Sequence, residues 1–416
     1  MSDANGVAGL HEERLVSLDV YRGLTVAGMI LVTDPGTYSA VYWPLRHAEW
    51  NGATATDMIF PSFLFIVGVA IPLSFAARIE RGADRARLAR HVVLRSVMLF
   101  AMGLIVNGFP DYDLHTLRIP GILQRIALCY LCGGLIYLWS RGSVRTRAQG
   151  SAGNWIIAGL TTFILAAYWL VLKLVPVPGF GAGRLDSLGN LPAYIDRSIL
   201  GTRHMWAYGL TPGYGVTYDP EGLISTLPAV ATLLVGVLAG VWMRTKRSGR
   251  QKAIGLAAAG LILLLMGWLL HPLLPINKRI WTSTFALFSS GVSLLAFSFC
   301  YAIVDLKRWR RWAAPAVIFG TNAIFAFALS GVITELSDRI QLREGMRDGS
   351  GAALPAQVGL PVWLCIVASA GSCIAGLRHC DCSAQYGDCG FALSQTDLPA
   401  RLRERKRSWT GNKCPT

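Results

Sequence analysis

Charged side chains are scarce in this chain of 416 residues. Asp, Glu, Lys and Arg together make up 15% of the sequence, against about 25% in an ordinary soluble domain. Hydrophobic residues reach 53%, and apolar runs long enough to cross a bilayer recur along the chain. The composition therefore favours an integral membrane protein over a soluble one.

Acidic residues are fewer than basic residues, 24 against 39, which gives a net charge of +15. Such an excess can indicate nucleic-acid binding. Here, however, the Lys and Arg residues gather in short connections between apolar runs, which is the pattern of membrane topology. We therefore expect no nucleic-acid partner.

Several well-known catalytic signatures have no match in a suitable context. The sequence lacks GxSxG, Walker A, GxGxxG and HExxH motifs, so serine-hydrolase, P-loop, Rossmann and zincin chemistry have no support. No internal repeat is visible, unlike in many transporters. The first fourteen residues lack an apolar core, so we expect no cleavable signal.

Cysteine gives no sign of a metal centre. Cys129 and Cys132 form a CxxC on an apolar run, without a second pair or histidines, so we expect them to serve helix contacts and expect no metal. Six of the nine cysteines follow residue 364 without metal-like or domain-like order. This end of the chain is either aberrant, for example frameshifted, or a lineage-specific cytoplasmic tail.

The apolar runs predict an all-α, polytopic membrane helix bundle of about ten transmembrane helices, because each run has about the length that spans the hydrocarbon. The predicted spans are 16–33, 57–77, 91–109, 119–139, 155–175, 223–243, 253–271, 280–304, 313–335 and 360–377. We divide the chain into a cytoplasmic segment 1–14, a transmembrane domain 15–335 and an atypical C-terminal region 336–416 with one helix.

The connections predict the orientation of the bundle. Every second connection is rich in Lys and Arg, namely 77–90, 140–149, 244–252 and 305–312, which places these connections and the N-terminus in the cytoplasm. The intervening connections then face outward, including a long segment 176–222 rich in Gly, Pro and Tyr. A loop of this length and composition predicts an ordered lid over the outer mouth.

The stretch 33–75 holds the most suggestive polar residues. Its loop carries His47, Glu49, Asn51 and Asp57 near a predicted membrane boundary, and an imidazole beside a carboxylate can move protons near neutral pH. The alternative is a solvated loop with His47 at the headgroup boundary and Thr56 or Asp57 as a helix cap.

Further polar residues lie within or beside the predicted spans, where charges usually face a bundle interior or an aqueous cavity. Several of them have a purely structural alternative. Asp19 and Arg22 form a helix-end ion pair, Asn322 binds a neighbouring helix, and the YDPEG segment with Asp219 and Glu221 is a turn. Arg125 needs an anionic partner at depth, such as a phosphate. The remaining candidates are Gln124, Asn277 and Lys278.

Five blocks of sequence, taken together and in order, resemble the heparan-α-glucosaminide N-acetyltransferase family, whose bacterial relatives include proteins described as related to N-acetylglucosamine transport. The blocks are HAEWNGATATDMIFPSFLFIVG, RIPGILQRIALCYL, YDPEGLISTLPA, PINKRIWTSTFAL and FGTNAIFAF. They extend from about residue 14 to about residue 335.

The resemblance implies a multi-helix membrane acetyltransferase that takes acetyl groups from cytosolic acetyl-CoA, a co-substrate, and delivers them to an amino sugar on the far side. It places the active histidine at His47. Asp57, Glu49 or Asp219 then orients the imidazole or binds the sugar, and we take Asp57 as the second catalytic candidate. The five blocks together hold the candidate substrate-binding or acyl-CoA-binding residues: Glu49, Asn51, Gln124, Arg125, Asp219, Glu221, Asn277, Lys278 and Asn322. Expected partners are the lipid bilayer, an amino-sugar acceptor and, as a possible homodimer, a second copy. The expected location is a bacterial inner membrane.

Two features depart from the family pattern. Relatives typically carry asparagines where this chain has Thr33 and Asp34, so oxyanion stabilisation stays open. The family also ends in another apolar helix and a short basic tail, unlike this C-terminus. Two rival functions share the same residues: a transporter of amino sugars or cell-wall fragments, and an acyltransferase that modifies envelope polysaccharide.

Overall fold

The computed structural model describes residues 15–33, 41–80, 82–141 and 147–348. Within them, eight helices are long and apolar enough to cross a membrane, and a bent pair raises the number to nine. The predicted helical membrane bundle is thereby confirmed. The predicted span 360–377 and the cysteine-rich end lie outside the described residues.

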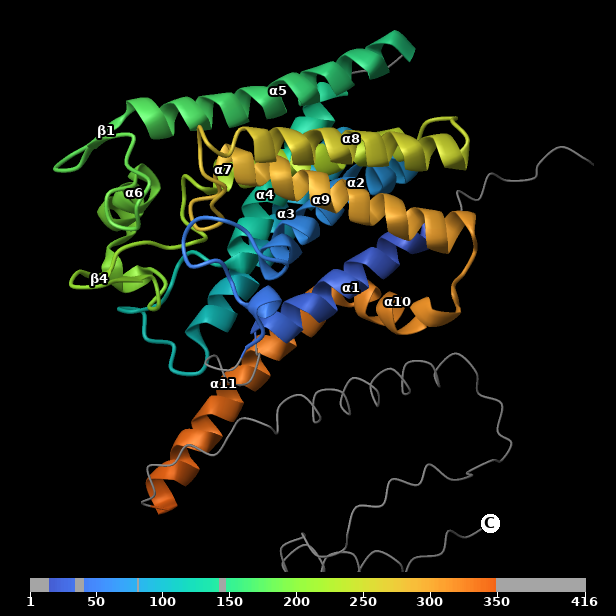
Figure 1. Cartoon of the computed structure of the whole chain (residues 1–416). Coiled ribbons are helices and arrows are strands. Elements are labelled where there is room, and N and C mark those ends of the chain that lie inside the picture. Colours follow the sequence, from blue (N-terminus) through green and yellow to red (C-terminus); the bar gives the residue numbers. More distant parts are fainter. Residues whose placement is uncertain (1–14, 34–40, 81, 142–146, 349–416) are drawn as a thin grey trace, which may run out of the picture. The chain divides into compact units, whose positions relative to one another are not determined.

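The long helices alternate with connections as predicted (Figure 1). Their bounds are α1 Val16–Thr33, α2 Ile59–Glu80, α3 Arg85–Gly108, α4 Ile122–Ser140, α5 Arg147–Leu174, α7 Thr226–Met243, α8 Gly249–Leu269 and α9 Ser283–Tyr301. Helix α8 runs alongside α9, and α2 is in extensive contact with α7. Side-chain caps set several starts, such as Ser248 and Gln251 in a capping box at α8.

Small residues allow α2 and α7 to approach closely at the centre of the bundle. A Cβ on Gly68 would lie 2.0 Å from the carbonyl oxygen of Leu233, and one on Gly236 would lie 2.1 Å from that of Phe65. Helix contacts of this kind are typical of membrane interiors, where small residues let backbones come together. Helix α7 is the most buried of the spans.

The ninth predicted span is wrong as a single straight helix. It consists of α10 (Ala314–Thr321) and α11 (Ala323–Asp348), which meet at Asn322 with a bend of 74°. Helix α10 packs against α1, where a Cβ on Gly23 would lie 1.7 Å from the Ala316 carbonyl oxygen. Helix α11 also continues well past residue 335, the predicted end.

The long segment between α5 and α7 is ordered, as predicted. It forms a two-stranded hairpin, β1 (Pro176–Val177) with β2 (Gly181–Ala182), then the short helix α6 (Leu191–Leu200), then a second hairpin, β3 (Leu210–Thr211) with β4 (Gly215–Val216). The side chain of Asn190 caps α6 by accepting a hydrogen bond from the Ala193 amide.

Candidate functional site

Four connections meet at one end of the bundle, and the candidate residues gather there. These connections precede α2, α4, α7 and α9, so the N-termini of four helices converge on the same region. Contacts between the connections are direct: Gly52 donates its amide to the Ile276 carbonyl at 2.7 Å, and Trp50 donates its indole N–H to the Leu185 carbonyl at 2.7 Å. Converging helix N-termini favour negative charge.

His47 and Asp57 form the centre of this region. Nδ1 of His47 lies 2.7 Å from Oδ1 of Asp57. A contact this short with a carboxylate needs a proton on Nδ1, so the neutral imidazole carries its free lone pair on Nε2. The His47 side chain is 37% exposed and Asp57 is buried. The imidazole is therefore oriented through Nδ1, while part of the side chain stays exposed.

Asp57 holds the loop rather than capping the helix. Its Oδ2 accepts hydrogen bonds from the amides of Ala48 and Thr54 and from the Thr54 hydroxyl. The 3₁₀ turn Thr56–Met58 has Ala55 at its N-cap, without a side-chain cap, and the Thr56 hydroxyl donates to the Pro44 carbonyl. The capping alternative for Asp57 and Thr56 is therefore wrong.

Lys278 is brought to this pair by the connection between α8 and α9. Its Nζ lies 3.1 Å from Nδ1 of His47 and 3.3 Å from Oδ1 of Asp57. Residues 52 and 277 form an isolated parallel bridge, and the Asn277 side chain donates to the Asn51 side chain at 3.1 Å. These two asparagines thus join the loops that carry His47 and Lys278.

The electrostatic environment keeps His47 neutral. Burial lowers the pKa of His47, and the positive charges of Lys278 and Arg279 lower it further, whereas the bond to Asp57 acts in the opposite direction. Burial likewise lowers the pKa of Lys278, against the attraction of Asp57 and Glu221. A neutral imidazole at neutral pH is the form required of a base or nucleophile.

A second cluster of charges lies around Arg118, just before α4. Arg118 binds Asp219 through two hydrogen bonds, of 2.9 and 2.7 Å, and Glu221 through one of 2.6 Å. Burial acts to raise the pKa of Glu221, but the charges of Arg118, Arg125 and Lys278 outweigh it and lower the pKa. The YDPEG segment is therefore more than a turn, since its two carboxylates fix Arg118 between the helices.

Aromatic rings join this cluster to the long loop. Tyr218 lies between Trp50 and Trp206, with ring centroids at 4.9 and 6.3 Å. The guanidinium groups of Arg118 and Arg279 lie over the Trp206 ring, at 6.0 and 5.4 Å from its centroid. Stacked cations and edge contacts of this kind hold a loop in place.

Arg125 is buried one turn inside α4. It donates to the Gly222 carbonyl and the Ser225 hydroxyl and stacks over Trp281, 5.1 Å from the ring centroid. Its Nε and Nη1 atoms and Nε2 of Gln124 are buried, and no described residue forms a hydrogen bond with them. These orphaned donors suit a polar or anionic ligand, as expected for Arg125.

Asp196, on α6, is a buried carboxyl that the sequence did not single out. Its Oδ1 accepts the Leu223 amide at 2.8 Å, and its Oδ2 has no hydrogen-bond partner within the part of the chain that the structure describes. Burial raises the pKa of Asp196 to about 7, and the nearby charge of Asp219 adds to the effect. Asp196 is therefore a buried carboxyl that titrates near neutral pH within the long loop.

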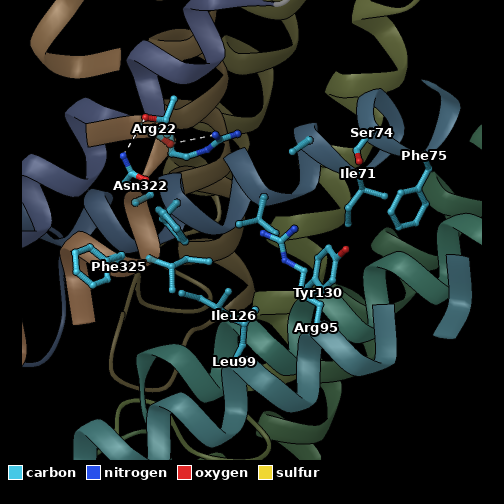
Figure 2. Close-up of a pocket in the computed structure, with 17 residues that line it drawn as sticks. Arg22, Ile71, Ser74, Phe75, Arg95, Leu99, Ile126, Tyr130, Asn322 and Phe325 are labelled. Carbon is cyan, nitrogen blue, oxygen red and sulfur yellow. Dashed lines mark hydrogen bonds between the residues drawn. The ribbon is translucent and has the colours of Figure 1, made fainter. Parts of the chain in front are cut away.

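A cavity of about 460 Å³ lies deeper in the bundle (Figure 2). Along α2 it extends from Phe63 to Phe75, about 18 Å at 1.5 Å per residue. Arg22 and Arg95 line it, together with the bend between α10 and α11. Arg22 also binds Asp19 at 3.1 Å, which confirms the predicted ion pair.

The structure brings most of the predicted site residues together and places four of them elsewhere. His47, Asn51, Asp57, Asp219, Glu221, Asn277 and Lys278 meet at the converging connections, whereas Asn322 lines the deeper cavity at the helix bend. Gln124 and Arg125 are buried at the start of α4. Glu49 is exposed on the loop surface.

Sequence reasoning missed Arg118 as a site residue. The available signal was its position, since it opens the RIPGILQR block immediately before a membrane span. It also did not foresee that Lys278 contacts His47, because 231 positions separate the two residues. In the described part of the chain, no His, Cys, Asp and Glu side chains form a group of three or more that could hold a metal ion.

Comparisons with known proteins agree with the resemblance of the sequence blocks. Residues 14–273 match the family described as heparan-alpha-glucosaminide N-acetyltransferase, catalytic. The mouse heparan-alpha-glucosaminide N-acetyltransferase is 30% identical over 352 residues, covering 76% of this chain and 53% of that protein. The human protein is 29% identical over 351 residues, with coverages of 76% and 52%. The chain thus spans about half the length of these curated relatives.

Proposed function

Because this chain belongs to the heparan-α-glucosaminide N-acetyltransferase family, we propose that it transfers an acetyl group from acetyl-CoA to the amino group of a glucosamine-type sugar. His47 is the catalytic residue of this proposal. The observation that carries it is the 2.7 Å contact between His47 and Asp57, which leaves the lone pair of Nε2 free on a side chain that is partly exposed.

The transfer needs a neutral amine, because an ammonium has no lone pair to attack a thioester. In a direct mechanism, Nε2 of His47 takes a proton from the amine as its nitrogen bonds to the acetyl carbon. The carbon–sulfur bond breaks, and the CoA thiolate takes up a proton to leave as the thiol. In a two-step mechanism, Nε2 first bonds to the acetyl carbon while the carbon–sulfur bond breaks and the CoA thiolate leaves. The amine then bonds to the same carbon, the bond from Nε2 breaks, and the freed Nε2 takes up the amine proton.

Asp57 orients the imidazole in either mechanism. Its carboxylate fixes the proton on Nδ1 and stabilises the positive charge that the ring gains during transfer. The N-termini of four helices and the cations Lys278 and Arg279 stand near the same place, where they favour negative charge on the acetyl oxygen of the transition state. These helix N-termini and cations could therefore stabilise the oxyanion in place of the asparagines that relatives carry at positions 33 and 34.

The deeper cavity suits the donor. Its length along α2 fits an extended pantetheine arm, and Arg22 and Arg95 provide positive charge for phosphates. Half-helix ends, as at the bend beside Asn322, commonly bind polar ligands in membrane proteins. Arg125 is the chain neighbour of the cavity residue Ile126 and stacks over Trp281, which follows Lys278 by three residues. In this proposal the orphaned donors of Arg125 contact the acyl-CoA on its way to His47.

The distribution of basic connections supports an orientation with this cavity opening towards the cytoplasm. His47 then lies on the outer face of a bacterial inner membrane, and the N-terminus lies inside. In this arrangement acetyl-CoA enters from the cytosol, while the acceptor arrives from the periplasm beneath the 176–222 loop. The aromatic rings of Trp50 and Tyr218 provide surfaces of the kind that sugars contact.

His47→Ala tests the proposal. We expect this variant to fold and bind lipid normally but to consume no acetyl-CoA in the presence of glucosamine-bearing acceptors. Rapid-quench labelling with radioactive acetyl-CoA and no acceptor separates the mechanisms, since label on His47 supports the two-step route. Near-normal turnover by His47→Ala in proteoliposomes would contradict the assignment.

Two further measurements test the orientation and the main rival. A cysteine placed at position 47 should react with a membrane-impermeant reagent from the periplasmic side, and labelling from the cytosol alone would overturn the relay. Sugar uptake into vesicles without acetyl-CoA would instead favour a transporter. Acetyl-CoA-dependent product formation without uptake supports the enzyme.

A further inference from the structure

The Lys278 ammonium lies at hydrogen-bond distance from Nδ1 of His47, the same ring nitrogen that contacts the Asp57 carboxylate. Nζ of Lys278 is 3.1 Å from Nδ1 of His47, and the same ammonium is 3.3 Å from Oδ1 of Asp57. An Nδ1–H and an ammonium are both donors, so they do not bind each other, and both turn to the carboxylate. Asp57 is therefore shared between two positive or potentially positive groups.

The position of Lys278 is fixed by its backbone rather than by its own charge. The amide of Gly52 bonds to the Ile276 carbonyl, and the Asn277 side chain bonds both to Asn51 and to the Ile280 amide. The Lys278 carbonyl accepts the Trp281 amide, and Trp281 is held in the left-handed region at φ 49°. These hydrogen bonds fix the backbone at Lys278, so that its ammonium lies beside the imidazole of His47.

We propose that Lys278 is a positioning residue that keeps the His47 imidazole unprotonated. A second positive charge at 3.1 Å penalises an imidazolium. By sharing Asp57, Lys278 also reduces the ability of that carboxylate to stabilise the charged ring. The consequence for catalysis rests on the proposed function, but the protonation of His47 itself does not.

The other charges around His47 act in known directions. Arg279, from the same connection as Lys278, also disfavours the imidazolium, and Asp57 favours it. Glu221, from the connection before α7, attracts Lys278. With Lys278 removed, Asp57 acts on His47 with its full charge, so the midpoint for protonation of His47 must rise.

Diethyl pyrocarbonate measures this midpoint without turnover, because it modifies only the unprotonated imidazole. The purified full chain is treated between about pH 4.5 and about pH 8.5, a window around the ordinary histidine pKa, and modification of His47 is followed by peptide mass spectrometry. Lys278→Met and Lys278→Gln remove the charge, and Lys278→Arg keeps it. Arg279→Met reports the effect of a more distant cation.

We expect both neutral variants to raise the midpoint by about one pH unit or more. We expect Lys278→Arg to stay close to the wild type and Arg279→Met to shift the midpoint by less. Adding Asp57→Asn to Lys278→Met or Lys278→Gln should lower the midpoint for His47 protonation again. An unfolded chain would not show this effect, because Asp57 would no longer lie beside His47. An unchanged or lower midpoint in either folded neutral variant overturns the proposal. The acetyltransferase proposal fails separately, through an active His47→Ala.

Discussion

Asp57→Asn separates the structural role of Asp57 from its chemical role. Its Oδ2 accepts the two amides and the hydroxyl of the loop, and its Oδ1 contacts His47 and Lys278 among the described residues. Asparagine retains one oxygen for the three loop bonds and replaces the other with an NH2 group. That group donates to Nδ1 of His47 and thereby moves the ring proton to Nε2.

The expected loss follows from this change of tautomer. An imidazole with its proton on Nε2 can neither take a proton from the amine nor accept the acetyl group there. General-base catalysis contributes about 10²- to 10⁴-fold, so turnover should fall by that factor, or about 3 to 5 kcal/mol of transition-state stabilisation. The ammonium of Lys278, whose pKa burial already lowers, can lose its proton and limit the cost to stability.

Asp57→Ala is the matched control, because it removes all the acceptors. Each orphaned loop donor costs about 1 to 3 kcal/mol, so this variant should lose both turnover and thermal stability. Acetyl-CoA consumption and thermal melting of the purified protein in detergent measure the two effects. Turnover by Asp57→Asn within tenfold of the wild type, at an unchanged melting temperature, would refute the reasoning about the tautomer.

Three further substitutions test the surrounding charges. Arg118→Met leaves the fully buried Asp219 without its cation and should lower the free energy of unfolding by about 3 to 5 kcal/mol. We expect a lower melting temperature and faster proteolysis within 176–222. Resistance to proteolysis equal to that of the wild type would argue against a role of Arg118 in holding this loop. Arg125→Met removes a buried cation that has no carboxylate within ion-pair distance among the described residues, so the apo protein should melt no lower while the KM for acetyl-CoA rises about tenfold. A lower melting temperature with unchanged KM would contradict this ligand role. Burial raises the pKa of Asp196 in the folded state from 3.8 to about 7, so between these pH values the native state binds a proton that the unfolded state has lost. The free energy of unfolding therefore falls by up to about 4 kcal/mol as pH rises from about 4 to about 7. Asp196→Asn should remove that dependence and melt higher than the wild type at pH 8, and an identical pH profile would exclude the effect.

The bundle itself followed from the sequence because lipid leaves few choices. A backbone in hydrocarbon must satisfy its own hydrogen bonds, so long apolar runs become helices. The eight described spans agree with their predicted runs to within a few residues at most ends. The bend at Asn322 escaped prediction, because both halves are apolar and only their neighbours decide where a helix breaks.

The candidate site was only half visible in the sequence. His47 and Asp57 lie ten positions apart in one polar loop, so local sequence was enough to pair them as candidates. The contact of Lys278 with His47, and that of Arg118 with Asp219, join distant connections. No local pattern encodes such pairs, since they depend on how the helices bring their ends together.

Sequence alone therefore determined the fold class of this protein, a helical bundle in the membrane, and one polar loop that carries a histidine and an aspartate. The tertiary structure decided the electrostatics of that imidazole, because the alternation of spans brings four helix N-termini and the cations before them to one end of the bundle. The energy between two charges depends on their separation, and here the closest cation to His47 comes from a connection far away in the sequence.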